Sequence, residues 1–216
     1  MLGRTIAVGD IHGCSIALRR LVEQIDLQPD DTFVGLGDYV NRGADSRGVL
    51  DYLIGLSSRC HFVPILGNHD EMMLQAVENG VNIDRWLSKG GEATLRSYGS
   101  TTSFDQIPTE HIDFLKQCRS YFETKTHFFL HANYRAELPL DQQDIQTIRW
   151  LSLRDSVPGP HLSGKTAILG HTPQPDVLDA GHFICLDTGC CNGGWLTAME
   201  VMTHKVWQVS QDGEVR

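Results

Sequence analysis

Three short apolar segments in the first third of the chain each end at a glycine that is followed by polar side chains. Their length and composition are typical of buried strands. The segments are Ile6–Val8, Thr32–Leu36 and Phe62–Leu66, and the runs that follow them are GDIHG at 9–13, GDYVNRG at 37–43 and GNHD at 67–70. The runs recur about every 29 positions, close to the length of a strand–helix unit. Because ligands bind at the carboxyl ends of strands in open α/β sheets, we expect the three runs to form one site.

The segments between these runs have the apolar spacing of helices that pack on a sheet. The first stripe comprises Leu18, Leu21, Val22 and Ile25, and the second comprises Val49, Leu50, Leu53 and Ile54. We expect the first helix to begin near Cys14-Ser15 and the second to be capped by Asp45 or Ser46. A third helix is predicted from Glu71 to about Glu78, with Asn79-Gly80 as its stop signal. Together these elements predict a βαβαβ arrangement.

The chain from about 81 to 122 carries mainly helical signals, with Ile112 and Leu115 on one side of a predicted helix. Two breaks interrupt the region, at Gly90-Gly91 and over Gly99–Gln106. We interpret it as a helical insertion beside the site. Its loops are the natural place for substrate selectivity.

From His127 onward the pattern changes to strands. Phe128–Leu130 ends at His131, Ala167–Gly170 ends at His171, Phe183–Leu186 leads to Asp187, and Leu196–Met202 with Lys205–Val209 predicts a hairpin. A βαβαβ half followed by a strand-rich half predicts two mixed β-sheets with helices on their outer faces, a four-layer α/β sandwich. Because we find no linker, we expect residues 1–216 to form a single domain.

Composition and charge narrow the class of protein. The 216 residues are 41% hydrophobic, enough to bury a sizeable core, and the formal net charge of −9 argues against binding nucleic acid by general electrostatic attraction. The N-terminal apolar run is too short for a signal peptide, and no apolar run is long enough to span a membrane. We therefore expect a cytoplasmic protein without a membrane partner. The six cysteines form no CxxC pair and are expected to be reduced and buried.

Six side chains with metal-ligand chemistry are predicted at strand ends. They are Asp10, His12, Asp38, Asn68, His131 and His171. Carboxylate, imidazole and amide donors together suit Mn, Fe or Zn, whereas Ca prefers more oxygens. Six ligands exceed what one catalytic ion needs, but they suffice for two ions that share the Asp38 carboxylate. Taken singly, a strand-end histidine is more often structural; together with the three runs, His131 and His171 are predicted ligands.

The three runs, the lone histidine and the later GHT at 170–172 resemble the motifs of a known family. It is the phosphoprotein phosphatase family of calcineurin-type dinuclear metallophosphoesterases, in its small bacterial and bacteriophage lambda-like serine/threonine protein phosphatase branch. The motifs span positions 9–172, and LDTGCCNGG at 186–194 is similar to that branch's ending. The resemblance implies that one metal ion is held by Asp10, His12 and Asp38, and the other by Asp38, Asn68, His131 and His171. It also implies hydrolysis by direct attack of a metal-bound hydroxide, without a covalent phosphoenzyme.

The same resemblance implies roles for residues outside the ligand set. Arg42 matches the arginine that binds phosphate oxygens, and His69 matches the general acid that protonates the leaving alkoxide. A second phosphate-binding arginine is expected before the GHT strand. Arg154 fits this position best, and Arg149 is the alternative.

Simpler interpretations stay open for some of these residues. Arg42 could pair with Asp45 on a solvated loop, and Arg154 could pair with Asp155. We interpret Asp187 as a structural hydrogen-bonding residue rather than a seventh ligand.

One position departs from the family pattern. Asn41 stands where the family has an aspartate that pairs with the general-acid histidine. The Asn41 amide can still accept a hydrogen bond from the imidazole, but it carries no charge that favours the imidazolium form. We therefore predict that His69 keeps its orientation while its pKa is lower than in aspartate-bearing relatives.

The sequence thus predicts a metal-dependent phosphoric monoester hydrolase of the serine/threonine protein phosphatase type. It would use two divalent ions, Mn in the first place, on a phosphorylated protein or a small phosphoester. The nearest enzymatic alternative is a diadenosine tetraphosphate hydrolase-like activity, because that related group shares the metal motifs and also lacks aspartate at the position of Asn41. A non-catalytic phosphate-binding module is a third interpretation, and the intact ligand set argues against it.

Overall fold

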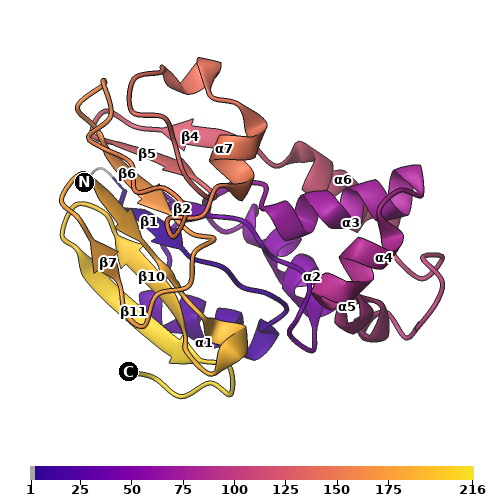
Figure 1. Cartoon of the computed structure of the whole chain (residues 1–216). Helices are drawn as coiled ribbons and strands as arrows, with labels where there is room; N and C mark the ends of the chain where they lie inside the picture. The colour runs from indigo at the N-terminus through magenta and orange to yellow at the C-terminus, as the bar shows by residue number, and fades with distance from the viewer. Residues whose placement is uncertain (1–2) are drawn as a thin grey trace.

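The computed structural model describes residues 3–216, in which two β-sheets pack face to face (Figure 1). The first sheet consists of β1 (Thr5–Val8), β2 (Thr32–Gly35), β3 (His61–Pro64), β9 (Asp187–Thr188), β10 (Trp195–Glu200) and β11 (Lys205–Ser210). The second consists of β4 (Tyr121–Glu123), β5 (His127–Leu130), β6 (Thr166–Leu169), β7 (Leu178–Asp179) and β8 (Phe183–Cys185). The strand orders are β11-β10-β1-β2-β3, with β9 also on β10, and β4-β5-β6-β8-β7.

Helices flank both sheets and follow the predicted alternation with strands in the first half of the chain. They are α1 (Ser15–Ile25), α2 (Ser46–Leu56), α3 (Asn68–Asn79), α4 (Ile83–Trp86), the π-helical turn η1 (Leu87–Gly91), α5 (Glu92–Ser97), α6 (Thr109–Gln117) and α7 (Ile145–Trp150). Short 3-10 turns, η2 (Leu140–Gln142) and η3 (Cys190–Asn192), lie in the second half. In Figure 1 the helices from α3 to α6 form a group to the right of the sheets. None of the helices described is long and apolar enough to cross a membrane.

The alternation of side chains along the strands explains the layers. Ile6 and Phe33 point to the face of the first sheet that packs against α1 and α2. Their neighbours Ala7 and Val34 point the other way and pack against Ile168 and other residues of the second sheet. The far face of the second sheet is covered in turn by residues from α7. The predicted four-layer α/β sandwich of two mixed sheets is therefore confirmed.

Three boundaries differ from the predictions. Helix α3 begins at Asn68 rather than Glu71, because the Gly67 N–H donates to Asp70 Oδ2 (3.0 Å) and caps the helix early. The region predicted as helical up to 122 instead ends in β4, whose residues pair antiparallel with β5. Helix α7 lies in the half predicted to be strands, and its 6 residues are too few to show a helical period.

The topology brings six strand ends to one side of the molecule. β1, β2 and β3 are parallel to one another, as are β5, β6 and β8. Five of these strands end just before one of the polar runs or candidate ligands, and β8 ends just before Asp187. The hairpin of β10 and β11 also forms as predicted and extends the first sheet on the other side of β1.

A buried carboxylate joins the starts of β1 and β2. Asp31 is 1% exposed and accepts hydrogen bonds from Arg4 N (2.9 Å), Arg4 Nε (3.1 Å) and Gln28 N (2.9 Å). Burial alone would raise the pKa of Asp31, but the hydrogen bonds from Arg4 and Gln28 outweigh it and lower the pKa. Asp31 therefore stabilises the folded state in its ionised form.

Replacing Asp31 by Asn should lower the free energy of unfolding by about 1–2 kcal/mol at pH 7, a value reduced by the partial exposure of Arg4. The lowered pKa sets the pH dependence. The loss of stability in the variant is complete above the pKa of Asp31 in the unfolded chain, about 4. It shrinks as the pH falls through the lower pKa of Asp31 in the folded protein. Urea unfolding at pH 7 and pH 3 measures it, with the exposed neighbour Asp30→Asn as control. An equal loss at both pH values would contradict the assignment.

Candidate metal centre

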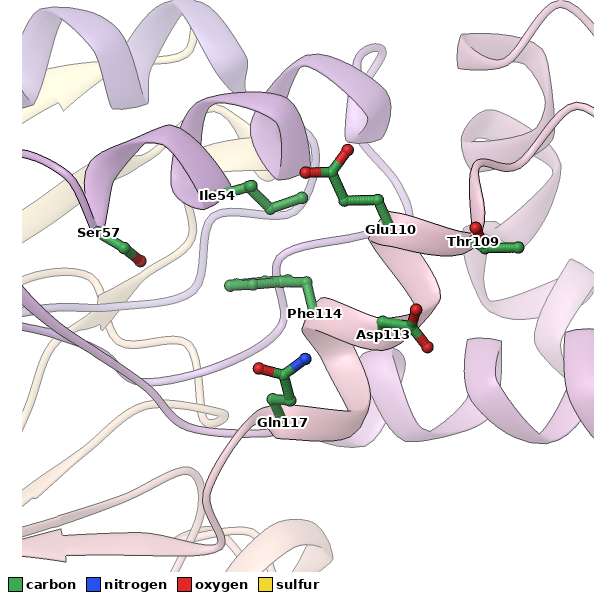
Figure 2. A pocket seen from close by; sticks show the side chains of 7 residues that line it. All are labelled: Ile54, Ser57, Thr109, Glu110, Asp113, Phe114 and Gln117. Atoms are coloured by element: carbon green, nitrogen blue, oxygen red, sulfur yellow. The ribbon is translucent and has the colours of Figure 1, made fainter.

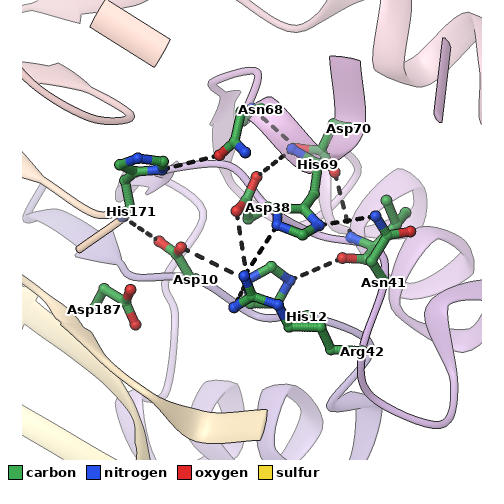
Figure 3. A network of polar contacts seen from close by, with 12 residues as sticks. Asp10, His12, Asp38, Asn41, Arg42, Asn68, His69, Asp70, His171 and Asp187 are labelled. Atoms are coloured by element: carbon green, nitrogen blue, oxygen red, sulfur yellow. Dashed lines mark hydrogen bonds and ion pairs between the residues drawn. The ribbon is translucent and has the colours of Figure 1, made fainter. Parts of the chain in front are cut away.

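Asp38 lies at the centre of a buried polar cluster at the carboxyl ends of the strands (Figure 3). Its Oδ2 is 3.4 Å from His12 Nε2, and its Oδ1 is 3.5 Å from His131 Nε2. The backbone N–H of His69 donates to Asp38 Oδ1 (2.8 Å), which fixes the carboxylate between the two histidines. The residue predicted to bridge two ions thus lies between the two predicted halves of the site.

On one side of Asp38, three acceptor atoms face one another without a hydrogen between them. His131 Nδ1 donates to Leu36 O (2.8 Å) and His171 Nε2 donates to Trp150 O (3.1 Å), so the other nitrogen of each neutral ring carries a lone pair. These two nitrogens are 3.2 Å apart and lie 3.0 and 2.9 Å from Asn68 Oδ1. Such an arrangement is repulsive unless a cation binds between the acceptors, so these donors fit a metal ion.

On the other side, His12 is oriented in the same manner. Its Nδ1 donates to Val40 O (2.9 Å), which leaves the Nε2 lone pair facing Asp38. Asp10 Oδ2 lies 3.9 Å from His12 Nε2, and Asp10 Oδ1 accepts from the His171 N–H (2.9 Å). Arg42 Nη1 donates to His12 Nε2 (3.0 Å), so a cationic group already lies against this nitrogen. All six predicted ligands are therefore brought together.

Burial determines the charge state of the cluster. It lowers the pKa of His12 to about 3, with the Arg42 charge adding to the effect, and lowers the pKa of His171 to about 4. Both rings are neutral at pH 7, as metal ligands must be. Burial also raises the pKa values of Asp38 and Asp10, and neighbouring carboxylates raise them further. A divalent cation would offset this unfavourable burial of negative charge.

His69 lies beside the cluster and contacts Asn41, but the hydrogen bond runs opposite to the predicted direction. Asn41 Nδ2 donates to His69 Nδ1 (2.9 Å), because Asn41 Oδ1 already accepts from the Thr94 hydroxyl (3.0 Å). Accepting at Nδ1 leaves the ring proton of a neutral His69 on Nε2. Burial is the main reason that the pKa of His69 is lowered. No local motif indicated Thr94, which comes from α5 in the helical insertion.

Backbone strain concentrates at the same place. Five of the eight non-glycine residues with positive φ in the described part of the chain belong to the predicted site: His12, Asp38, Asn41, Arg42 and His171. Such conformations cost on the order of 1–3 kcal/mol each and persist only where surrounding contacts enforce them. This clustering at the strand ends is typical of a functional site.

A pocket of about 230 Å³ opens over the cluster. Its lining residues are Asp38, Arg42, Asn68, His69, Met72, Arg85, Lys89, Trp150 and His171. Arg85 and Lys89 come from α4 and η1 and were not predicted as site residues. No local sequence motif indicated them, because the backbone leaves the helical conformation at Lys89 and Gly90.

The two arginines predicted as the second phosphate ligand do not line this pocket. Arg149 is 7% exposed, and its Nη1 donates to Glu71 Oε1 (2.6 Å) in an ion pair with α3. Arg154 is exposed, and its Nη2 donates to Pro173 O (3.2 Å). Asp187 is buried, and its Oδ1 accepts from the Gly189 N–H (3.0 Å), the kind of contact predicted for it.

A second pocket, of about 380 Å³, lies between α2 and α6, away from the cluster (Figure 2). Its lining includes Glu110 and Asp113 together with Ile54 and Phe114, and no cationic side chain. Two carboxylates beside apolar groups would repel a phosphate. This pocket therefore lacks the phosphate-binding chemistry of the pocket over Asp38.

Comparisons with known proteins agree with this geometry. A family model described as calcineurin-like phosphoesterase matches residues 3–203. Serine/threonine-protein phosphatase 1 of Salmonella typhimurium is 28% identical over 201 residues, covering 90% of both chains. Serine/threonine-protein phosphatase 2 of the same organism is 30% identical over 200 residues, covering 86% of this chain and 88% of the relative. A symmetrical bis(5'-nucleosyl)-tetraphosphatase of Methylococcus capsulatus is 25% identical over 259 residues, covering 90% of both chains.

A solved structure shows the same similarity in three dimensions. A protein provisionally described as a diadenosine tetraphosphatase has a TM-score of 0.77 and 26% sequence identity, covering 97% of this chain and 94% of that chain. The predicted family and fold class are confirmed. With donors at the strand ends that could hold metal ions, the chain belongs to the calcineurin-like phosphoesterase family.

Proposed function

We propose that this protein hydrolyses phosphate monoesters with two divalent metal ions, Mn in the first place, and that phosphorylated serine and threonine side chains are its first candidate substrates. The observation that carries the proposal is the convergence of three hydrogen-free acceptors, His131 Nε2, His171 Nδ1 and Asn68 Oδ1. The similarity to two serine/threonine-protein phosphatases over most of their length supports the substrate class.

The ligand residues divide into two sets that share one carboxylate. Asp10, His12 and Asp38 would hold one ion, and Asp38, Asn68, His131 and His171 would hold the other. Two such ions would lower the pKa of a bound water molecule and withdraw charge from phosphate oxygens. The neutral state of the buried histidines means that no proton has to leave these rings before an ion binds.

Arg42 and His69 supply the remaining chemistry. Arg42 Nη2 lies 3.1 Å from His69 Nε2, the nitrogen that carries the His69 proton. Two donors at this distance repel, and a substrate oxygen placed between them would accept a hydrogen bond from each. Arg42 would thereby neutralise charge on the phosphate. His69 would protonate the leaving oxygen from its imidazolium form, so that loss of the Nε2 proton returns the neutral ring, and the Asn41 amide would then have to turn its Oδ1 toward Nδ1–H. Arg154 stays a predicted phosphate contact, but it does not line the pocket over Asp38.

A second candidate substrate is a dinucleoside polyphosphate. The observation that favours it is the presence of Arg85 and Lys89 in the pocket, which add two positive charges beyond Arg42. The relatives named symmetrical bis(5'-nucleosyl)-tetraphosphatase agree with this candidate. Turnover of a phosphopeptide compared with diadenosine tetraphosphate, both with Mn, separates the two.

The metal assignment predicts two Mn ions bound per chain in isothermal titration calorimetry. Asp38→Asn removes the shared charge and should weaken binding about 10- to 100-fold, with loss of phosphopeptide hydrolysis. Asp113→Asn, at an exposed position of α6, is the matched control and should behave as wild type. Two tight sites in the Asp38 variant, or no Mn-dependent hydrolysis of any phosphoester by wild type, would refute the proposal.

The general-acid role predicts that His69→Asn acts according to the leaving group. An alkoxide needs a proton when it departs, whereas 4-nitrophenolate needs little help. We expect kcat for phosphoserine peptide to fall about 10²- to 10⁴-fold and kcat for 4-nitrophenyl phosphate to fall much less. Steady-state kinetics on both substrates measures the difference. Equal losses on the two substrates would show that His69 acts otherwise.

The neutral partner at position 41 predicts a shift in pH dependence. In Asn41→Asp a carboxylate would accept from His69 Nδ1 and favour the protonated ring, which raises the pKa of His69. A general acid works only while protonated, so the alkaline limb of the kcat/KM profile should move upward by about one pH unit or more. Profiles of wild type and variant from pH 5 to 10 measure it. Identical limbs would reject the hypothesis.

A further inference from the structure

A buried chain of two hydroxyl groups connects the helical insertion to the loop that carries Arg42. It consists of Ser46, the first residue of α2, and Thr94 from α5, and both side chains are 0% exposed. Ser46 Oγ and Thr94 Oγ1 lie 3.0 Å apart, and both accept from the Asn41 N–H, at 3.1 and 2.9 Å. Thr94 also donates to Asn41 Oδ1 (3.0 Å), so the chain ends at the amide beside His69.

The hydrogens of this chain fit in one direction only. A hydroxyl group has one hydrogen to donate. Within residues 3–216 the hydrogen-bonding partners of Ser46 Oγ are the Asn41 N–H and Thr94 Oγ1, so the Ser46 hydrogen goes to Thr94. Thr94 then donates its own hydrogen to Asn41 Oδ1. In the opposite direction Asn41 Nδ2 would donate to Thr94 and Thr94 to Ser46, which would leave the Ser46 hydrogen buried without an acceptor.

This direction determines where the neutral His69 ring carries its proton. Because Oδ1 is bound by Thr94, Asn41 turns Nδ2 toward His69 Nδ1 (2.9 Å), and the ring proton has to lie on Nε2. Arg42 opposes this placement, because its Nη2 lies 3.1 Å from His69 Nε2 and would bind a lone pair there (Figure 3). The tautomer of His69 is therefore decided by competition between Arg42 and Thr94, which acts through Asn41.

The result of this competition affects phosphate binding. When the proton lies on Nε2, His69 and Arg42 present two donors to the pocket over Asp38, and one oxygen of a bound phosphate can accept from both. When the proton lies on Nδ1, Nε2 accepts from Arg42, and one N–H of the guanidinium is no longer available to the phosphate. A residue of α5 outside the pocket lining thus controls how the pocket binds an anion.

We propose that Thr94 is a positioning residue for the phosphate pocket, because through Asn41 it holds the His69 proton on Nε2 so that His69 and Arg42 both donate to one phosphate oxygen. The proposal rests on the proposed function, in which His69 and Arg42 contact the phosphoryl group. It adds a residue of the helical insertion to that site. Since a protonated ring carries hydrogens on both nitrogens, the role applies to the neutral form of His69.

Nitrogen-15 NMR of the Zn-loaded protein tests the tautomer directly, since Zn, unlike Mn, does not broaden the signals. The His69 signals are identified by their absence from His69→Asn. At pH 7 wild type should carry the proton on Nε2, Thr94→Val should carry it on Nδ1, and Thr94→Ser should restore it to Nε2. Ser46→Ala is the matched control and should keep the wild-type tautomer, because it removes a buried hydroxyl of the same chain while Thr94 can still donate to Asn41.

Calorimetry with inorganic phosphate on the Mn-loaded protein tests the consequence for the pocket. Loss of one charge-assisted hydrogen bond should weaken phosphate binding about five- to tenfold in Thr94→Val. Thr94→Ser and Ser46→Ala should stay within about twofold of wild type. If circular dichroism shows that Thr94→Val is unfolded, Thr94→Ala replaces it with the same expected changes.

The outcomes separate this proposal from the proposed hydrolase. A wild-type proton on Nδ1, or a Thr94→Val variant that keeps the proton on Nε2, would overturn the positioning role even if phosphoesters are hydrolysed. A proton that moves without weaker phosphate binding would overturn it as well. A proton that moves to Nδ1 together with weaker phosphate binding, both restored in Thr94→Ser, would support the role even if no phosphoester is hydrolysed.

Discussion

The repulsion between lone pairs at the strand ends is the constraint on which the site depends. His131, His171 and Asn68 present acceptors within hydrogen-bond distance of one another, and each ring is held by a backbone carbonyl that fixes its tautomer. A fold under no functional demand would turn one of these rings, place a donor between them, or expose them to water. The parallel strands of the two sheets and the strained backbone at the strand ends instead keep the three acceptor atoms facing one another. The fold thus maintains an arrangement that only a bound cation makes favourable.

Much of this arrangement could be predicted because the local signals agree with one another. A buried strand, a glycine and a metal-competent side chain recur in the first sheet, and parallel strands bring such ends to one edge. The same reasoning found His131 and His171 in the second sheet. The glycines carry further information, since a Cβ at Gly67 would collide with the Asp38 carboxylate. Local sequence thus indicated where the backbone must approach the site closely.

The remaining features could not be predicted because they depend on contacts between distant segments. The Asn41 amide is turned by Thr94, which lies 53 positions later in the chain, and no local pattern links the two. Arg149 has a suitable position in the sequence, but Glu71 on α3 binds it in an ion pair. No sequence motif indicated Arg85, because its place in the pocket depends on its contact with Trp150. In each case tertiary structure decided which of several chemically similar side chains reaches the site.

The helical insertion links these unpredicted features. Through Thr94 it orients the amide beside His69, and through Gly90 it packs on the loop of Arg42. Lys89 lies directly before these two contacts on the same stretch of chain. A shift of this insertion would therefore change the substrate pocket and the general acid together, whereas the metal ligands come from the strand ends and would stay in place. Metal binding and substrate preference can consequently vary independently on this fold, which agrees with the presence of both phosphatases and tetraphosphatases among its relatives.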